Sequence, residues 1–220
     1  MSKRPVVFDL DGTLVDSRRD IVVAANHVRQ SAGLPALPDE VVAGFVGDGA
    51  RYLIENVMGV DRAEPSLDRH LAAFLDYYEA HAVDHTTLMP HATEAMDALA
   101  DRPLALCTNK SRRTTLAVLD GLGIAERFRV VVAGGDTVQN KPSAEPLLLV
   151  ARELGVEPRE LIMVGDGPQD IESARAAGAF GVGVRGGILP IERLIAASPA
   201  ALLEDLSQLS ALVEGLEGAR

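Results

Sequence analysis

The sequence has one cysteine, Cys107, and no tryptophan, so no disulfide bond within the chain can support the fold. A lone cysteine is typical of a protein from a reducing compartment, and we therefore expect a cytoplasmic location. Long apolar runs are also missing, since none reaches the roughly 18 residues that a membrane helix needs. The residues before Asp9 form no apolar region of signal-peptide length. We accordingly expect neither a membrane partner nor export.

Positive charge is scarce, and lysine is scarcest of all. The chain has 21 Lys and Arg residues against 32 Asp and Glu residues, which gives a formal net charge of −11. Such a surface repels phosphate backbones, so we expect no nucleic-acid partner. The three lysines are Lys3, Lys110 and Lys141, and an interior lysine in so lysine-poor a chain needs a specific reason. With 47% hydrophobic residues over 220 positions, the chain can bury one large core plus a small inserted unit.

Short β-rich apolar runs, separated by helical stretches, predict a parallel sheet with helical crossovers. The runs are Pro5 to Leu10, Leu104 to Cys107, Val130 to Ala133, Leu161 to Val164, and Gly181 to Val184. Polar or glycine residues follow each of the first four runs. Because the carboxyl ends of parallel strands face one crevice, we expect these polar clusters to meet at one edge of the sheet. Later elements are predicted as helices at Ser111 to Leu122, Ala144 to Leu154 and Asp170 to Ala177, then a helix, a short strand near Leu202 and a last helix from Ser207.

More than 90 residues separate the first two runs, far more than one crossover helix needs. Apolar residues at spacings of three and four predict helices in this insert, at Ile21 to Ala32, Asp39 to Phe45, Ala50 to Met58 and Ser66 to His81. Ser17 and Asp20 form the pattern of an amino-terminal cap for the first of these helices. The expected fold class is therefore α/β, a Rossmann-like parallel sheet core (residues 1–15 and 87–220) with an inserted α-helical cap (residues 16–86).

Four acids follow the ends of predicted strands. Asp9 and Asp11 stand two apart where the first run ends, so in extended geometry their side chains share a face. Asp166 and Asp170 follow a later run and are expected at the same edge of the sheet. Carboxylates this close repel each other unless a cation neutralises them. Hard oxygen ligands without His or Cys favour Mg²⁺, typically together with phosphate oxygens, so the pattern indicates a magnesium site for phosphoryl transfer.

Four sequence blocks carry a resemblance to a known family. In chain order they are Asp9-Leu10-Asp11-Gly12-Thr13-Leu14, Thr108-Asn109-Lys110, Lys141-Pro142, and Gly165-Asp166-Gly167-Pro168-Gln169-Asp170. Together they resemble the haloacid dehalogenase (HAD) superfamily of phosphatases, and more narrowly the phosphoglycolate phosphatases. The match spans the chain, and the insert is similar to the mobile cap that closes over the active site in this family. One turn departs from the pattern, because Met89-Pro90-His91 stands where phosphoglycolate phosphatases often have Pro-Gly.

The resemblance implies a catalytic role for four residues. Asp9 would be the nucleophile that forms an aspartyl-phosphate, and Asp11 would protonate the leaving group and then activate water. Thr108 would hold a phosphoryl oxygen, while Lys141 would neutralise both the transferring group and Asp9. Asn109, beside Thr108 in the second block, is assigned with Thr108 and Lys141 to substrate binding.

The resemblance also implies Mg²⁺ as the cofactor. Asp9, Asp11 through its backbone carbonyl, and Asp166 would bind the ion, and Asp170 would orient these ligands. Asp170 has a second interpretation, because it can cap the helix that follows it.

A glycine-bearing loop in the insert, Val46 to Arg51, resembles a loop that reaches over the active site in phosphoglycolate phosphatases. A second anion on the substrate, such as a carboxylate, needs a hydrogen-bond donor there. We expect Arg51 to bind this anion, supported by the amides around Gly49 at a helix amino terminus. The alternative interpretation of Arg51 is a solvated surface charge.

The expected activity is Mg²⁺-dependent hydrolysis of a small anionic phosphate monoester, with 2-phosphoglycolate as the first candidate. A dehalogenase would not keep a second acid like Asp11, and a phosphonate hydrolase would need a cap lysine, which the stretch from Asp16 to Thr86 lacks. A sugar-phosphate phosphatase or a hexose phosphomutase stays open. A receiver-like phospho-acceptor domain is disfavoured, because such domains have about 120 residues and no cap. We expect a monomer or homodimer.

Overall fold

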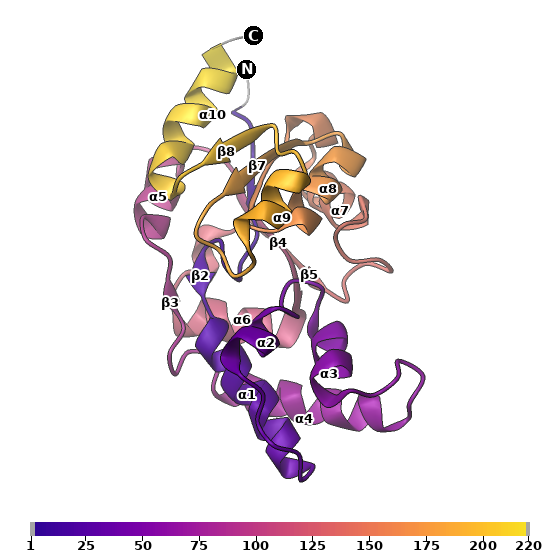
Figure 1. Cartoon of the computed structure of the whole chain (residues 1–220). Helices are drawn as coiled ribbons and strands as arrows, with labels where there is room; N and C mark the ends of the chain where they lie inside the picture. The colour runs from indigo at the N-terminus through magenta and orange to yellow at the C-terminus, as the bar shows by residue number, and fades with distance from the viewer. Residues whose placement is uncertain (1–2, 219–220) are drawn as a thin grey trace.

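The structure is a computed structural model that describes residues 3–218 of the chain. Its centre is a sheet of six parallel strands in the order β5-β4-β1-β6-β7-β8, in the upper half of Figure 1. The strands are β1 (Val6–Phe8), β4 (Leu104–Ser111), β5 (Val130–Gly134), β6 (Ile162–Gly165), β7 (Phe180–Val184) and β8 (Ala201–Leu203). The predicted parallel sheet is confirmed, with β1 between β4 and β6.

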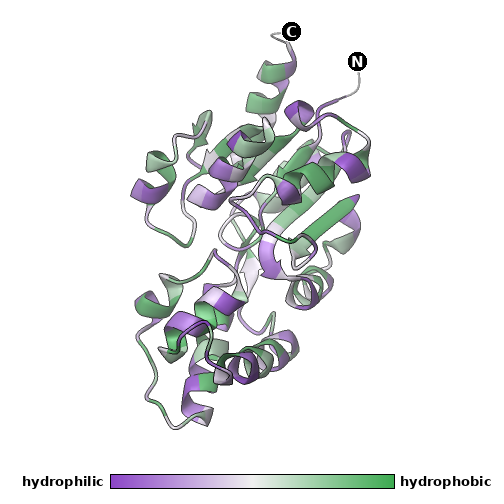
Figure 2. Ribbon diagram, turned by 90° about the vertical axis from the view of Figure 1, so that its right-hand side faces the viewer, coloured by the Kyte–Doolittle hydropathy of each residue, from purple (hydrophilic) through white to green (hydrophobic). Residues whose placement is uncertain are grey.

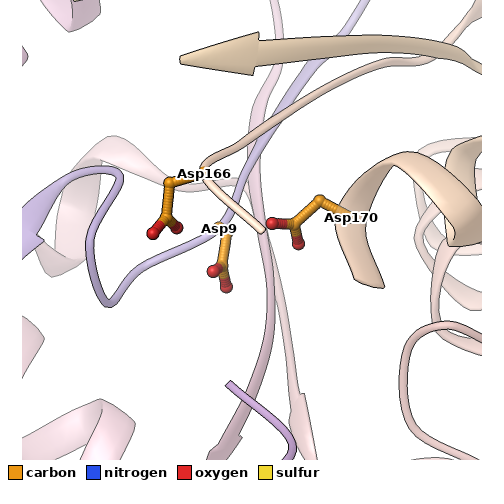
Figure 3. Close-up of side chains that lie close together, drawn as sticks. All are labelled: Asp9, Asp166 and Asp170. Carbon is orange, nitrogen blue, oxygen red and sulfur yellow. The ribbon is translucent and has the colours of Figure 1, made fainter. Parts of the chain in front are cut away.

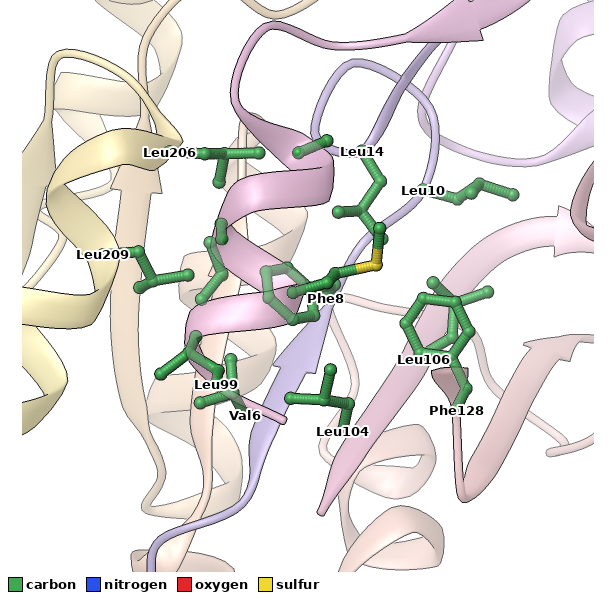
Figure 4. Packing of buried hydrophobic residues seen from close by; sticks show 14 of the residues in the cluster. Val6, Phe8, Leu10, Leu14, Leu99, Leu104, Leu106, Phe128, Leu206 and Leu209 are labelled. Atoms are coloured by element: carbon green, nitrogen blue, oxygen red, sulfur yellow. The ribbon is translucent and has the colours of Figure 1, made fainter. Parts of the chain in front are cut away.

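Helices cover both faces of this sheet. One face packs on α5 (Ala92–Ala98), α6 (Arg112–Gly121) and α10 (Leu209–Gly218), and the other on α7 (Glu145–Leu154) and α8 (Pro168–Ala177), with α9 (Ile191–Ala196) against α8. Successive side chains of β1 point to opposite faces of the sheet. Val6 and Phe8 therefore join the hydrophobic cluster on one face, and Val7 joins the cluster on the other. Figure 2 shows the strands as mainly hydrophobic, and Figure 4 shows Phe8 surrounded by aliphatic side chains.

Four helices form a second unit, which we call the helical insertion. They are α1 (Arg18–Ser31), α2 (Asp39–Ala43), α3 (Ala50–Met58) and α4 (Ser66–Ala80), in the lower half of Figure 1. They bury a hydrophobic cluster of their own, which includes Ile54, Leu67 and Phe74. Two short antiparallel strands, β2 (Val15–Asp16) and β3 (Thr87–Leu88), carry the chain into and out of the insertion. The order of sheet, helical insert and crossovers agrees with the predicted fold class.

The start of α1 differs from the prediction. Ser17 makes no capping hydrogen bond, and its hydroxyl instead donates to Asp11 Oδ1 at 2.5 Å. The Asp20 carboxylate accepts hydrogen bonds from the backbone N–H groups of His85 and Thr86. Ser17 thus lies at the predicted N-cap position, but the predicted side-chain capping bonds are absent, because the side chains of Ser17 and Asp20 bind partners outside the helix.

The sequence-based prediction also omits α5. This helix follows His91, which has a left-handed backbone with φ 64°, and no side chain caps its first turn. Short 3₁₀ turns complete the chain, at Ala125–Arg127, Pro158–Glu160 and Leu206–Gln208. The last of these leads directly into α10, close to the predicted helix start at Ser207. Across residues 3–218, the structure has no helix that is long and apolar enough to cross a membrane.

Candidate active site

Three carboxylates meet at the carboxyl edge of the sheet. Asp9 follows β1, Asp166 follows β6, and Asp170 lies in the first turn of α8. One oxygen from each lies within 4.8 Å of the others, and all three residues are buried. Figure 3 shows the three carboxyl groups next to one another. The structure thus brings together three of the four acids that the sequence singled out.

Glycine backbone packs directly against these acids. A Cβ atom at Gly12 would lie 2.4 Å from Asp166 Oδ2, and one at Gly165 would lie 2.2 Å from the Asp170 carboxyl group. Gly12 also has a φ of +87°, which side-chain-bearing residues rarely adopt. The glycines of the first and fourth blocks therefore let the backbone approach closely enough to shield the carboxylates from water.

Burial and mutual repulsion raise the proton affinity of two acids. Burial, followed by the charges of Asp9 and Asp170, raises the pKa of Asp166 to about 8. Burial also raises the pKa of Asp170 to about 7, even though the nearby Lys141 acts in the opposite direction. A divalent cation would relieve this repulsion, and within residues 3–218 the cluster offers carboxylate oxygens alone. These residues fit Mg²⁺, which prefers oxygen ligands.

Lys141 is the cation inside the cluster. Its Nζ lies 2.9 Å from Asp9 Oδ1, 2.6 Å from Asp170 Oδ1 and 2.6 Å from the carbonyl oxygen of Cys107. These contacts use all three of its N–H donors. Burial lowers the pKa of Lys141, but the Asp170 and Asp9 carboxylates outweigh it and the net shift is upward, so the side chain stays charged. Burial raises the pKa of the Cys107 thiol to about 12, so this cysteine is a protonated packing residue.

Asp170 makes two kinds of contact, one to Lys141 and one to the helix start. Its Oδ1 accepts from Lys141, and its Oδ2 accepts from the backbone N–H of Gly167 at 3.0 Å, at the start of α8. The same carboxylate thus joins the acidic cluster and caps a helix.

The side chain of Asp11 turns away from the acidic cluster toward Ser17 and Lys110. Lys110 Nζ lies 2.9 Å from Asp11 Oδ1 and 3.2 Å from Oδ2. The same Nζ donates to the Tyr78 hydroxyl at 2.6 Å and lies 4.2 Å from the centre of the tyrosine ring. Both Lys110 and Tyr78 are buried. A chain of contacts therefore runs from Asp11 through a lysine of the core to α4 of the helical insertion.

Sequence reasoning missed this use of Lys110 and Tyr78. In the sequence, Lys110 stands in the second block and Tyr78 in a helical pattern, and neither position by itself indicates their contact. The scarcity of lysine is the one signal in the sequence that points to Lys110. The chain has three lysines, and two of them, Lys110 and Lys141, pair with acids of the site.

Asn109 links three segments. Its Nδ2 donates to the carbonyl oxygens of Gly47 at 2.9 Å and Lys141 at 2.8 Å, and its Oδ1 accepts from the Lys141 backbone N–H at 2.9 Å. Asn109 thus joins the loop before α3 to the core. The adjacent Thr108 is buried at the site, and its hydroxyl accepts from the Lys110 backbone N–H at 3.2 Å.

A cavity of about 50 Å³ separates the core from the helical insertion. Its core wall includes Asp9, Asp11 and Thr108, and its far wall is mostly apolar. The apolar lining residues are Ile21, Val46, Ala50, Leu53 and Phe74. Gly49 also lines this cavity. The space is small, charged on one side and apolar on the other.

Arg51 lies outside this cavity. Its guanidinium pairs with Asp68, with the side chain 42% exposed, and it lines a neighbouring surface hollow together with Asn109 and Lys141 of the site. The loop that carries it lines the cavity itself through Gly47 and Gly49.

Comparison with known proteins agrees with this geometry. A family model described as haloacid dehalogenase-like hydrolase matches residues 6–184. The chain belongs to this family. Among its relatives, a phosphoglycolate phosphatase of Chromobacterium violaceum is 40% identical over 187 residues, covering 82% of this chain and 84% of the relative. A phosphoglycolate phosphatase of Escherichia coli K12 is 34% identical over 228 aligned positions, covering 94% and 90%.

Solved structures of the family share the architecture. A predicted phosphoglycolate phosphatase from Haemophilus somnus superimposes with a TM-score of 0.87 at 25% identity, covering 96% of this chain and 98% of that one. CbbY from Rhodobacter sphaeroides, in complex with phosphate, gives a TM-score of 0.81 at 22% identity, covering 94% and 96%, and speaks for the fold alone. The predicted membership in the HAD superfamily, and the resemblance to its phosphatases, are confirmed.

Proposed function

We propose that the protein is a Mg²⁺-dependent phosphatase that hydrolyses small anionic phosphate monoesters through an aspartyl-phosphate on Asp9, with 2-phosphoglycolate as the preferred substrate. The observation that carries this proposal is the burial of Asp9, Asp166, Asp170 and Lys141 in one cluster, from which Asp9 reaches the wall of a small cavity. The names of the relatives support the choice of substrate.

Asp9 has one oxygen free for the reaction. Its Oδ1 accepts from Lys141, whereas Oδ2 has no hydrogen-bond partner among residues 3–218. Attack of Oδ2 on phosphorus forms a new O–P bond and breaks the ester O–P bond. Asp11 gives its proton to the departing oxygen and then takes one from the water that attacks the aspartyl-phosphate. That second step releases inorganic phosphate and restores the Asp9 carboxylate.

The remaining residues stabilise charge and orientation. Asp9, Asp166 and the backbone carbonyl of Asp11 would hold Mg²⁺, with Asp170 behind them, and the ion would neutralise the phosphoryl oxygens. Lys141 keeps Asp9 and Asp170 in place and adds positive charge beside the transferring group. Thr108 offers its hydroxyl to a phosphoryl oxygen.

The helical insertion, within the proposed cap of residues 16–86, excludes water from this chemistry. At the cavity, hydrogen bonds from Asn109 to Gly47 and from Lys110 to Tyr78 join it to the core, and Arg113 of α6 forms exposed ion pairs with α4 nearby. Opening at β2 and β3 would break these contacts and let the ester enter. The mostly apolar far wall favours a short leaving group over a hexose, whose hydroxyl groups would find few partners there.

Activity measurements with purified protein test the proposal. Hydrolysis of p-nitrophenyl phosphate is expected with Mg²⁺ and not with EDTA, and Asp9→Asn should lower kcat by roughly 10³-fold or more. Asp136→Asn is the matched control, because Asp136 also follows a strand but pairs with Arg112 away from the acidic cluster. Metal-independent activity, or an active Asp9→Asn variant, would refute the mechanism.

A panel of esters tests the substrate. We expect kcat/KM for 2-phosphoglycolate to exceed that for hexose phosphates by at least about ten-fold. A higher value for a hexose phosphate would instead favour a sugar-phosphate phosphatase. A cytoplasmic monomer or homodimer remains our expectation, and light scattering would decide the oligomeric state.

A further inference from the structure

Lys110, in β4 of the core, is a buried lysine beside Asp11. An ammonium group has three N–H donors. Lys110 Nζ donates to both oxygens of the Asp11 carboxylate and to the Tyr78 hydroxyl. Because the two Asp11 oxygens belong to one carboxylate, one N–H shared between them is enough to hold Asp11, and the third N–H can then turn to a substrate anion. Lys110 also lines the cavity.

The Tyr78 hydroxyl offers a second donor beside it. Its oxygen accepts from Lys110, and its own O–H has no acceptor in residues 3–218. Burial raises the pKa of Tyr78 to about 12, so the hydroxyl keeps its proton. Tyr78 lines the same cavity. Two adjacent donors, one of them charged, match the two oxygens of a carboxylate.

We propose that Lys110 and the Tyr78 hydroxyl bind the carboxylate of the substrate's leaving group, and so select phosphate esters of short 2-hydroxy acids. This inference rests on the proposed function, because it takes Asp11 as the acid that faces the ester oxygen.

The distances place this donor pair beside the leaving group. The ester oxygen must contact Asp11 to receive its proton, and Lys110 Nζ lies 2.9 Å from the same carboxylate. In a 2-hydroxy acid, one carbon separates the ester oxygen from the carboxyl group, so the two groups stand about 3 Å apart. A carboxylate at that spacing reaches Lys110 while the ester oxygen stays on Asp11.

Among the described residues that line the cavity, Lys110 is the only positively charged side chain that could bind this anion. Lys141 has all its donors occupied by Asp9, Asp170 and a backbone carbonyl. Arg51 pairs with Asp68 outside the cavity. Lys110 therefore takes over the role that the sequence suggested for Arg51.

The pair also lies across the boundary between the two units. Lys110 belongs to β4 of the core, and Tyr78 belongs to α4 of the helical insertion. A carboxylate that binds both Lys110 and Tyr78 holds the insertion against the core. Binding of the substrate acid would therefore favour the closed state of the site.

The test compares 2-phosphoglycolate with 2-hydroxyethyl phosphate, an ester of similar size without the carboxylate. Tyr78→Phe should lower the kcat/KM ratio of the two esters by roughly ten-fold, because it removes one hydrogen bond to a charged group. Tyr77→Phe makes the same chemical change at the preceding residue of α4, outside the cavity, and should leave the ratio unchanged. An unchanged ratio in Tyr78→Phe would overturn the role of its hydroxyl.

Lys110→Met provides a second, independent variant. It removes the charge at similar length, and the ratio should fall toward one. Thermal melting checks that the variant folds. Equal losses with both esters in Lys110→Met and Tyr78→Phe would overturn the inference, since the residues would then act on Asp11 or on folding alone. If the wild-type protein hydrolyses neither ester, the proposed function itself is wrong. That outcome differs from a wild-type protein that is active but whose variants lose activity equally on both esters.

Discussion

Lys141 and Asp170 form a fully enclosed ion pair, with Nζ 2.6 Å from Oδ1 and both side chains at most 1% exposed. The same ammonium reaches Asp9 at 2.9 Å, so one lysine fixes the position of the proposed nucleophile relative to an acid from the fourth block. Because water cannot reach these buried groups, removing the ammonium would leave both carboxylates without a compensating charge.

Lys141→Met should therefore abolish most of the activity. We expect kcat on p-nitrophenyl phosphate to fall by about 10²- to 10³-fold, the usual effect of removing a fixed charge from a buried site. Loss of one partner of a buried pair should also lower the free energy of unfolding by about 3–5 kcal/mol. Steady-state kinetics and thermal melting measure both effects.

Lys141→Arg and Lys3→Met are the matched variants. The guanidinium is larger and planar, so it cannot reproduce the three contacts of the ammonium and should not restore kcat. Lys3 is an exposed lysine, and its removal should change neither kcat nor the melting temperature. An Arg variant with near wild-type kcat would show that charge alone suffices.

The pH dependence of stability follows from Asp166. Its pKa is raised to about 8 in the folded, metal-free protein, chiefly by burial, and lies near 4 in an unfolded chain. The folded state then binds more protons between these values, so stability in EDTA should fall as pH rises from about 5 to 8. Asp166→Asn should flatten this slope, and melting curves across that range measure it. A stability that rises with pH in EDTA would contradict the assignment.

Magnesium should reverse this trend. The ion competes with the proton for the same carboxylates, so the increase in melting temperature on adding Mg²⁺ should be larger at pH 8 than at pH 6. Proton release on Mg²⁺ binding, measured by titration calorimetry in two buffers of different ionisation enthalpy, gives an independent readout. In Asp166→Asn both the stabilisation and the proton release should be smaller.

The polar ends of the strands could be predicted from the sequence because their causes are local. Asp9 and Asp166 each follow a strand directly, and the rule that parallel strands end at one edge brings them together without knowledge of any contact. The glycines of the motifs could be predicted to lie close to other backbone or side chains, because a close approach leaves no room for a side chain.

The partners of Ser17, Asp20 and Tyr78 could not be predicted in the same way. A Ser-x-x-Asp pattern is the signal of a helix cap. The carboxylate of Asp20 instead accepts a hydrogen bond from the backbone N–H of Thr86, 66 residues later in the sequence. The tyrosine fits an apolar helical stripe, and only the fold reveals that a lysine 32 residues away meets its hydroxyl. Competition between local and distant partners decides such cases, and the sequence shows only the local one.

Asp20 ties the start of the helical insertion to its end. Its buried carboxylate accepts from the backbone and ring of His85 and from the backbone and hydroxyl of Thr86. Asp20→Asn replaces one acceptor oxygen by an N–H₂ group that faces donors, so the free energy of unfolding should fall by about 2–4 kcal/mol. Asp39→Asn, at an exposed acid in the first turn of α2, is the control and should have little effect.

The same carboxylate gives a pH signature. Burial tends to raise the pKa of Asp20, but the hydrogen bonds from His85 and Thr86 outweigh it and lower the pKa overall. A lowered folded pKa contributes stability above the unfolded value, and this contribution is lost as pH falls through the folded pKa. The difference in melting temperature between wild type and Asp20→Asn should therefore shrink below about pH 4. A difference that stays constant well below pH 4 would mean that the charge of Asp20 is not involved.

Arg51 offers the sharpest contrast between the sequence-based expectation and the position of the side chain. Its pair with Asp68 is exposed, and such pairs contribute about 0–1 kcal/mol. We expect Arg51→Ala to change the kcat/KM ratio of 2-phosphoglycolate to 2-hydroxyethyl phosphate by less than about two-fold. Asp68→Asn breaks the same pair from its other side and should have an equally small effect. A loss in Arg51→Ala as large as that in Tyr78→Phe, with Asp68→Asn unchanged, would mean that the arginine leaves Asp68 and binds the substrate carboxylate during turnover.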